Sequence, residues 1–222
     1  MSGPTIVIDT FRAFTTAAYL MANGADHIVL AETLDEARSR AASIPDSILC
    51  GEDGGRKPED FDLGNSPVEA DEYPGLATRT VVMRTSGGTR TIVRALRSGA
   101  GPVYAASLVV ARSTVAAVRS SDRVTIIASG LAGVSMADED EETADLISDR
   151  LLGRADDPLR VDRILNGEGA ARLRSSPWID PSELARCVEV DRYQFALLAA
   201  VVGSVATLRA VHCVGSDREV RK

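Results

Sequence analysis

The amino-acid sequence predicts an α/β fold in which helices cover both faces of a largely parallel or mixed central sheet. Short apolar runs rich in β-branched residues recur along the chain, and segments with helical periodicity separate them. This alternation is typical of a three-layer α/β/α architecture, because a parallel pair of strands needs a crossover connection. At 222 residues we expect a single domain, with a helix-rich subregion from about residue 153.

The first half of the chain contains strand and helix signals in regular alternation. Gly24 stands where a first helix would end, and Thr33 with Glu36 forms a capping box at the start of a second. The glycine turn at Gly87 and Gly88 precedes a third helix. The expected strands are residues 5–8, 27–30, 47–50 and 80–84, and the expected helices are residues 15–23, 33–44 and 89–97.

The second half continues the alternation and then becomes rich in helical patterns. Strands are expected at 103–106 and 123–129, and helices at 108–118 and 139–152. We interpret the apolar run 195–208 as a buried helix, because charged residues bracket it and it is too short to span a membrane. A last strand is expected at 210–214.

Composition excludes some classes of partner. A net charge of −7 argues against broad binding to nucleic acid or to an anionic membrane, so an anionic substrate would need local arginines. The three cysteines are scattered and form neither a zinc motif nor a disulfide framework. With no apparent signal peptide or membrane span, we expect a cytoplasmic protein.

The segment 50–67 contains many residues of the kinds that bind ligands or transfer protons. It combines glycines, carboxylates, an amide, a hydroxyl and two cations in one irregular stretch. Glycines let the backbone approach a ligand closely, and carboxylates bind hard cations or transfer protons. The alternative is a solvated surface loop with a turn at each end.

Polar or glycine residues also follow several expected strands. Asp9, Glu52, Thr85, Ser107 and Gly130 each stand directly after an apolar run. Because ligands bind at the carboxyl ends of the strands in open α/β sheets, these five positions are expected to converge on one cleft.

Several short motifs occur along the chain in a characteristic order. They are VIDTFRAFTTA at 7–17, GEDGG at 51–55, FDLGNSP at 61–67, TSGGTR at 85–90, ASLVVA at 106–111, SGLAG at 129–133 and Asp138-Glu139. In this order they resemble the motifs of the 2-phosphosulfolactate phosphatase family. Departures from the family pattern include Gly87 for an asparagine, Ser129 for a cysteine and Asp53 for a basic residue. The resemblance implies a magnesium-dependent phosphatase that converts phosphosulfolactate to sulfolactate in coenzyme M biosynthesis.

The carboxylates supply the candidate metal ligands. Asp9 and Glu52 are the first candidates for Mg²⁺, which prefers one or two carboxylates with waters and phosphate oxygens. Asp138 and Glu139 are further candidates because they match the family pattern, although most acids in the run 138–142 are expected on a solvated first helical turn. Asp62 or a neighbouring carboxylate would position water.

Arg12 is expected to bind the phosphate through two oxygens, and the strand-to-helix turn 85–89 could hold an anion with backbone N–H groups. The alternatives are an N-cap aspartate at Asp9 beside a solvated Arg12, a Pro-fixed turn after Asn65, and Thr89 as a helix N-cap. The candidate substrate-binding residues are Arg12, Asn65, Ser66, Thr85, Gly88, Thr89, Ser107 and Gly130.

The sequence therefore predicts a phosphoric monoester hydrolase with Mg²⁺ as cofactor and a small phosphorylated metabolite as partner. Nucleic acid and membrane are not expected partners, and a homodimer is one option for the assembly. Two alternatives stay open. One is a related phosphatase for another small phosphate in specialised biosynthesis, and the other is a non-catalytic binding protein with the same fold.

Overall fold

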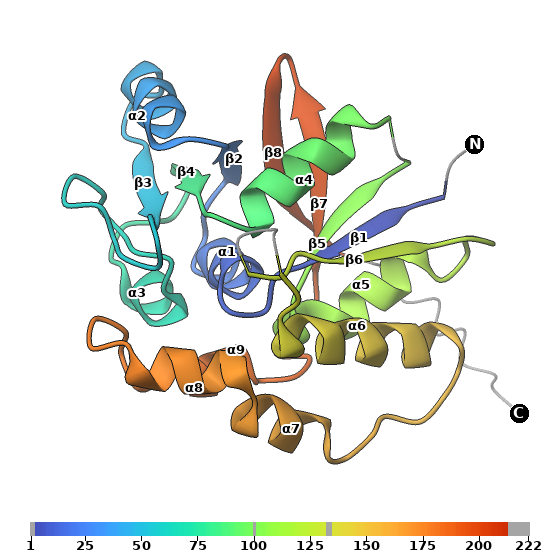
Figure 1. Cartoon of the computed structure of the whole chain (residues 1–222). Helices are drawn as coiled ribbons and strands as arrows, with labels where there is room; N and C mark the ends of the chain where they lie inside the picture. Colours follow the sequence, from blue (N-terminus) through green and yellow to red (C-terminus); the bar gives the residue numbers. More distant parts are fainter. Residues whose placement is uncertain (1–2, 100, 132–134, 213–222) are drawn as a thin grey trace, which may run out of the picture.

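An eight-stranded mixed sheet forms the centre of the molecule (Figure 1). The computed structural model describes residues 3–99, 101–131 and 135–212. The strand order is β3-β4-β2-β8-β7-β5-β1-β6, in which β2, β3 and β4 form one parallel group and β1, β5 and β6 another. The strands are β1 Thr5–Ile8, β2 His27–Ala31, β3 Ile48–Gly51, β4 Thr80–Arg84, β5 Val103–Ala106, β6 Thr125–Ala128, β7 Ala196–Val202 and β8 Val205–Val211.

A β-hairpin joins the two parallel groups, and here the expectation of a buried helix at 195–208 is wrong. β7 pairs with β5, and β8 pairs with β2, both antiparallel. Val202 pairs with Val205, which leaves Gly203 and Ser204 as a two-residue turn. Gly203 has φ of 65°, which suits such a turn and is costly for other residues. The last strand thus begins at Val205 rather than at residue 210, and residues 213–214 lie outside the described part.

Helices cover both faces of the sheet, as expected for three layers. Most bounds agree with the sequence expectation within a few residues. The helices are α1 Ala13–Ala22, α2 Leu34–Ser43, α3 Pro67–Glu72, α4 Gly88–Arg97, the 3-10 helix η1 Leu108–Val110, α5 Ala111–Val118, α6 Asp138–Leu151, α7 Arg160–Asn166, α8 Glu168–Ser175 and α9 Glu183–Cys187.

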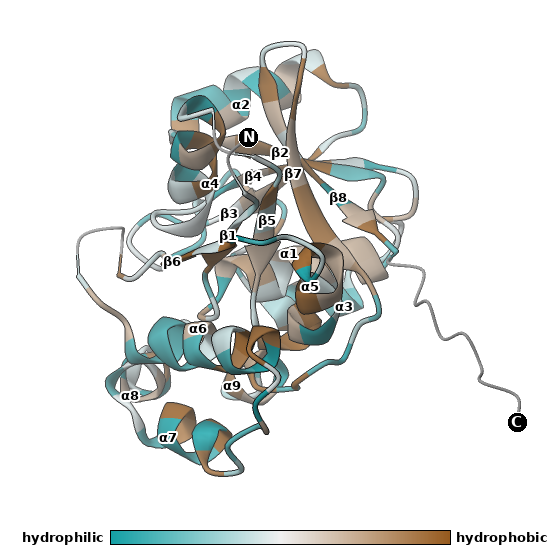
Figure 2. Cartoon of the chain, turned by 90° about the vertical axis from the view of Figure 1, so that its right-hand side faces the viewer, coloured by the Kyte–Doolittle hydropathy of each residue, from teal (hydrophilic) through white to brown (hydrophobic). Residues whose placement is uncertain are grey.

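Alternation along the strands divides the core between the two faces. Val7 contributes to a cluster with α1 and α4, whereas Ile6 and Ile8 contribute to a cluster with α5 and α6. In β2 and β4, a separate set that includes Val29 packs against α2. Because successive side chains of a strand point to opposite faces, both faces of this apolar sheet are buried. Figure 2 shows hydrophobic residues along β7 and hydrophilic ones on α2 and α6.

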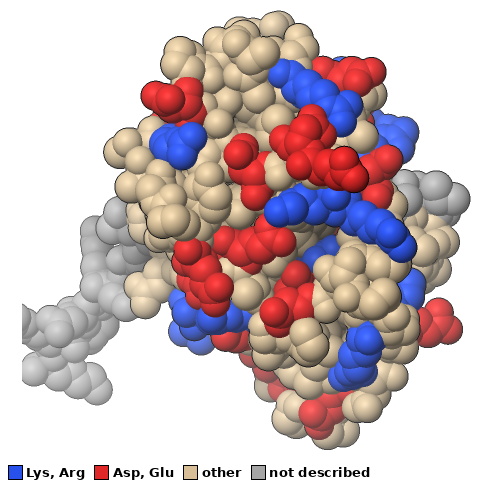
Figure 3. All heavy atoms as spheres, turned by 90° about the vertical axis from the view of Figure 1, so that its left-hand side faces the viewer, with Lys and Arg blue, Asp and Glu red and all other residues tan. Residues whose placement is uncertain are grey.

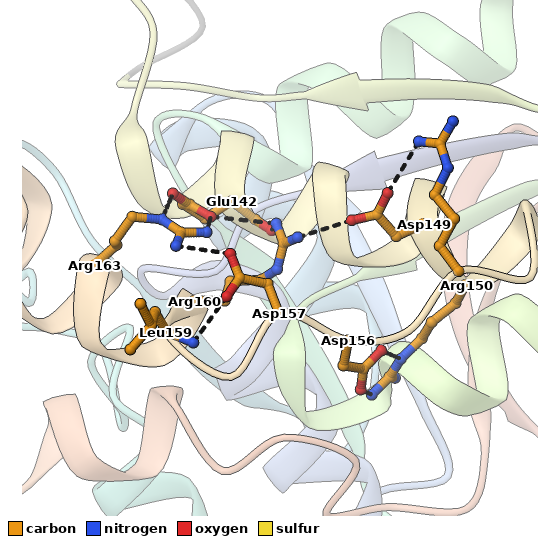
Figure 4. Close-up of polar contacts among 9 residues, drawn as sticks. Glu142, Asp149, Arg150, Asp156, Asp157, Leu159, Arg160 and Arg163 are labelled. Carbon is orange, nitrogen blue, oxygen red and sulfur yellow. Dashed lines mark hydrogen bonds and ion pairs between the residues drawn. The ribbon is translucent and has the colours of Figure 1, made fainter.

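An ion-pair network fixes α7 and the chain before it against α6 (Figure 4). The buried Arg160 donates to the carboxylate of Asp149 at 2.9 Å and to the backbone oxygen of Glu142 at 2.8 Å. Arg163 binds Glu142 and Asp157. The network anchors the segment that leads directly into α8, one of the elements lining the site described below.

Two features of the exterior bear on partners. Among the described residues, no helix has the length and apolar character needed to cross a membrane. On the face shown in Figure 3, acidic and basic side chains are intermixed and form no broad positive patch.

Candidate active site

A pocket of about 270 Å³ lies where the carboxyl ends of the parallel strands meet. Asp9, Glu52, Thr85 and Gly130 line it, and they follow β1, β3, β4 and β6 respectively. Further lining residues come from α8 and the chain after it: Arg172, Leu173, Ser176, Trp178 and Ile179. Ser107 follows β5 but is not among the lining residues.

Two helices present their first backbone N–H groups to Asp9. Its Oδ1 accepts from the N–H of Ala13 at 3.0 Å, and its Oδ2 accepts from the N–H of Gly88 at 2.8 Å. A Cβ at Gly88 would stand 2.8 Å from Oδ2, so glycine allows this close approach. Burial raises the pKa of Asp9 to about 6 against the effect of these hydrogen bonds, and the charge of Glu52 adds to the rise.

Glu52 is held between the loop that follows it and the turn after β4. Its Oε2 accepts from the N–H of Gly55 at 2.7 Å and from the hydroxyl of Ser86 at 3.1 Å. Its Oε1 accepts from the backbone N–H of Ser86. Five hydrogen bonds therefore fix Asp9 and Glu52 in the same pocket.

These bonds change the interpretation of the 85–89 turn. The N–H groups of Ser86 and Gly88 donate to Glu52 and Asp9, and that of Thr89 donates to the Thr85 hydroxyl. The turn therefore orients carboxylates with the N–H groups that we expected to hold an anion. Thr89 is not the helix N-cap either, because α4 begins at Gly88 with Gly87 as its N-cap.

The start of α6 brings two further carboxylates into the pocket. Asp140 accepts from the N–H of Thr10 at 2.7 Å and from that of Gly130 at 3.0 Å. Glu139 and Asp140 are only 3% and 2% exposed, so the expectation of a solvated face is wrong for Asp140, whereas Glu139, a candidate ligand from the sequence, does line the pocket. Asp140 was missed as a site residue, because its role depends on contacts with β1 and β6 that the acidic run does not reveal.

Burial dominates the electrostatics of these two acids. It raises the pKa of Glu139 to about 8, with a further contribution from its hydrogen bond with Asp138. Burial and the negative charge of Asp9 raise the pKa of Asp140 well above its usual value. The Oε2 atom of Glu139 is buried and has no hydrogen-bond partner within the described part of the chain. The pocket therefore contains more negative charge than its surroundings compensate.

Asp138 and Asp62 lie outside the pocket lining. Asp138 accepts from the N–H of Gly169 at 3.0 Å and so joins α6 to α8. Asp62 is exposed and accepts from the N–H of Leu49 at 2.8 Å. The structure therefore gives both carboxylates a local contact and does not bring them to Asp9 and Glu52.

The other predicted residues divide in the same way. Asn65 lines the pocket, and its buried Oδ1 has no hydrogen-bond partner among residues 3–99, 101–131 and 135–212. Ser66 instead caps α3 by accepting from the N–H of Glu69 at 3.1 Å. Ser107 is buried, and its hydroxyl has no partner among the residues that the structure describes. Thr89 is fully buried against Thr85.

Among the described residues, two arginines line the pocket. Arg12 forms a buried ion pair with Glu183, and its Nη2 donates to the Gly55 oxygen at 3.3 Å. Arg172 lies 3.6 Å from Oε1 of Glu139. Sequence reasoning missed Arg172, because it stands in a charged helix that gives no local sign of a ligand.

Trp178 closes one side of the pocket against the loop after β3. Its Nε1 donates to the Gly55 oxygen at 3.1 Å, and the guanidinium of Arg56 lies 3.9 Å from its ring centroid. This contact links segments more than a hundred residues apart. Since Gly55 also donates to Glu52, Trp178 supports the loop that positions a pocket carboxylate.

The residues present fit a hard cation. Among the described residues, no three His, Cys, Asp or Glu side chains are grouped to hold a metal ion by themselves. Mg²⁺ does not require such a group, because it commonly takes one or two carboxylates and completes its shell with water and phosphate oxygens. The unpartnered buried oxygen of Glu139 and the raised pKa values of Asp9 and Asp140 indicate a site that added positive charge would stabilise.

The fold and pocket define an α/β protein whose ligand site lies at the carboxyl edge of its sheet. A model of the family described as 2-phosphosulpholactate phosphatase matches residues 1–176. The chain belongs to this family, whose members are phosphoric monoester hydrolases.

Individual relatives agree with this assignment. A probable 2-phosphosulfolactate phosphatase of Pseudothermotoga lettingae is 35% identical over 160 residues, covering 72% of this chain and 67% of that protein. A protein of the same description from Deinococcus radiodurans is 35% identical over 181 residues, which cover 77% of this chain and 74% of that protein.

Proposed function

We propose that this protein is a magnesium-dependent phosphatase that hydrolyses 2-phosphosulfolactate to sulfolactate and phosphate. The observation that carries the proposal is the group of buried carboxylates at the strand ends, led by Asp9 and Glu52, in one pocket. A phosphate ester is itself anionic, so such a pocket can accept it only if a cation neutralises the carboxylates. The substrate is that of the relatives, which are described as probable 2-phosphosulfolactate phosphatases.

Asp9 and Glu52 would hold the ion, because neighbouring N–H groups already orient both carboxylates. When bound, Mg²⁺ supplies positive charge to the phosphoryl oxygens and orients them. Arg12 borders the same space, and its guanidinium would donate to a phosphoryl oxygen while it stays paired with Glu183. Asn65 can contribute its amide, whose Oδ1 has no partner within the described residues.

A different carboxylate than Asp62 is needed near the attacked phosphorus. Glu139 lines the pocket, and its Oε2, which packs against Gly169, has no hydrogen-bond partner among the described residues, so Glu139 is the better candidate to hold the attacking water or the departing oxygen. Asp140 is less suitable, since both of its oxygens already accept backbone N–H groups.

Phosphate release from a panel of phosphomonoesters tests the proposal. With Mg²⁺ present, 2-phosphosulfolactate is expected to have the highest kcat/KM. Asp9→Asn should abolish most of the release, whereas the matched variant Asp62→Asn, in a carboxylate outside the pocket, should keep it. A higher kcat/KM for another small phosphate would mean that this protein is a phosphatase for a different substrate. No release from any ester would favour a non-catalytic binding protein.

Two further parts of the proposal concern the cellular location and the pathway. Cys50 and Cys187 are free and buried, which is compatible with the reducing cytosol. A phosphatase acting on 2-phosphosulfolactate would supply sulfolactate to coenzyme M biosynthesis.

A further inference from the structure

Of the two arginines that line the pocket, Arg172 is less buried and makes the weaker ion pair. Arg12 has 8% side-chain exposure and forms an ion pair with the equally buried Glu183. Arg172 has 41% side-chain exposure, and its one ion pair within the described residues is to Glu139 at 3.6 Å, beyond ordinary hydrogen-bond length. Its guanidinium therefore remains available to an anion that enters the pocket.

The packing of α8 against α6 fixes the position of Arg172. The N–H of Gly169 donates to Asp138, and a Cβ at Gly169 would lie 2.1 Å from Oε2 of Glu139. Only the absence of a side chain allows this contact. Arg172 follows three residues later, on the same side of the helix, and so reaches the pocket wall beside Glu139.

The pocket is lined mainly by acidic groups, so an anionic substrate needs a further positive charge there, which Arg172 can supply. Asp9, Glu52, Glu139 and Asp140 line the pocket, whereas Arg12 is largely compensated by Glu183. A cation held by Asp9 and Glu52 would serve the transferred phosphate. A second anionic group on the same substrate would still face Glu139 and Asp140 unless a further positive charge met it.

We propose that Arg172 binds the anionic group of the substrate that is not transferred, and thereby selects phosphomonoesters that carry a second oxyanion. The proposal rests on the phosphatase function proposed above. In 2-phosphosulfolactate this oxyanion is the sulfonate or the carboxylate, and a guanidinium can bind either through two parallel N–H donors. Arg172 exchanges its loose contact with Glu139 for this stronger one.

Three esters separate the possible sources of the oxyanion. 2-Phosphosulfolactate has both groups, 2-phospholactate keeps the carboxylate alone, and glycerol 2-phosphate has neither. Arg172→Gln should lower kcat/KM about ten- to a hundredfold on esters with the recognised oxyanion, mainly through KM, because a charge-assisted contact is lost. Glycerol 2-phosphate should change less than about twofold. A loss confined to 2-phosphosulfolactate identifies the sulfonate, and an equal loss on 2-phospholactate identifies the carboxylate.

Two variants serve as controls. Arg174→Gln removes an exposed arginine of the same helix outside the pocket lining, and it should leave all three values unchanged. Arg172→Lys keeps the charge without the planar donors, and it should recover part of the lost affinity. Equal losses on all three esters for Arg172→Gln would mean that the residue acts through Glu139, and no loss on any would mean that it contacts no substrate; either result overturns the proposal.

A binding measurement separates failure of this proposal from failure of the proposed function. Trp178 is the single tryptophan of the chain and lines the pocket, so its fluorescence can report occupancy. With Mg²⁺ present, wild-type protein should bind sulfolactate, and Arg172→Gln should weaken that binding about tenfold or more, whichever of the two oxyanions is recognised. Absence of turnover with this difference between wild type and variant intact would reject the phosphatase function alone, whereas equal sulfolactate affinity in the two proteins would overturn the role of Arg172.

Discussion

The ion pair between Arg12 and Glu183 gives a predicted phosphate ligand a second role at the scale of single residues. Both side chains are buried, and Arg12 also donates to the Gly55 oxygen. Removal of one partner leaves the other charge buried and unpaired, which is costly. Arg12 therefore joins α9 to the loop after β3 while it borders the pocket.

Arg12→Lys tests whether the residue also binds phosphate. Lysine keeps the charge but loses the planar donors, so kcat/KM should fall about tenfold or more, while thermal stability changes little. Steady-state kinetics and a melting curve on the same preparation measure both. If the melting temperature falls while kcat/KM of the folded enzyme stays within about twofold, Arg12 is a structural residue only.

Glu52→Gln tests the assignment of a metal ligand. The amide can keep some of the hydrogen bonds from Gly55 and Ser86 but loses the charge that a hard cation prefers. The Mg²⁺ concentration for half-maximal activity should rise at least about tenfold. Asp53→Asn is the matched control in the same loop, because Asp53 is exposed and pairs with Arg84. An unchanged Mg²⁺ requirement in Glu52→Gln would remove Glu52 from the site.

At the scale of elements, α8 depends on the network that anchors α7. Arg160 has 6% side-chain exposure and binds Glu142 and Asp149. Arg160→Ala should cost about 1–3 kcal/mol of unfolding free energy, because hydrogen bonds to charged groups are lost in a buried setting. Arg154→Ala, which removes an exposed partner of the same Asp149, should cost less than about 1 kcal/mol. Denaturant unfolding compares the two, and equal effects would contradict an anchoring role for Arg160.

Elements differ in how far the sequence reveals them. The parallel strands are predictable, since each is a short apolar run between polar breaks. The β7–β8 hairpin is not, because the run 195–208 is apolar apart from Gly203, Ser204 and Thr207 and suits either a buried strand or a buried helix. Its turn at Gly203-Ser204 is the one local signal, and it distinguishes the two only once antiparallel pairing is considered.

The same limit applies to the site. Asp9, Glu52, Thr85 and Gly130 are predictable because strand ends in such folds share one edge. Asp140 and Arg172 are not, because both lie in charged helical segments whose solvated and buried positions look alike in sequence. Only the packing of α6 and α8 against the strand ends distinguishes them.

At the scale of the whole molecule, the buried acids link stability to pH. The pKa values of Asp9 and Glu139 are about 6 and about 8 in the folded protein, above their unfolded values of 3.8 and 4.5. Between those values the folded state binds more protons than the unfolded state. The free energy of unfolding of the metal-free protein should therefore fall as pH rises from about 4 to about 8.

Mg²⁺ should reverse this trend, because it binds the ionised carboxylates and protons compete with it. Thermal melting with Mg²⁺ and with chelator should show a larger stabilisation at pH 8 than at pH 5. Asp9→Asn should reduce the difference between the two pH values. An equal Mg²⁺ effect at both, or none at either, would contradict binding of the ion at these acids.

The central claim is that the pocket carboxylates form a magnesium site that hydrolyses a phosphate ester. Its most direct test is phosphate release from 2-phosphosulfolactate by the purified chain, first with Mg²⁺, then after chelation, and again after Mg²⁺ is restored. We predict release that stops on chelation and returns with the ion. Full release in excess chelator would contradict the account.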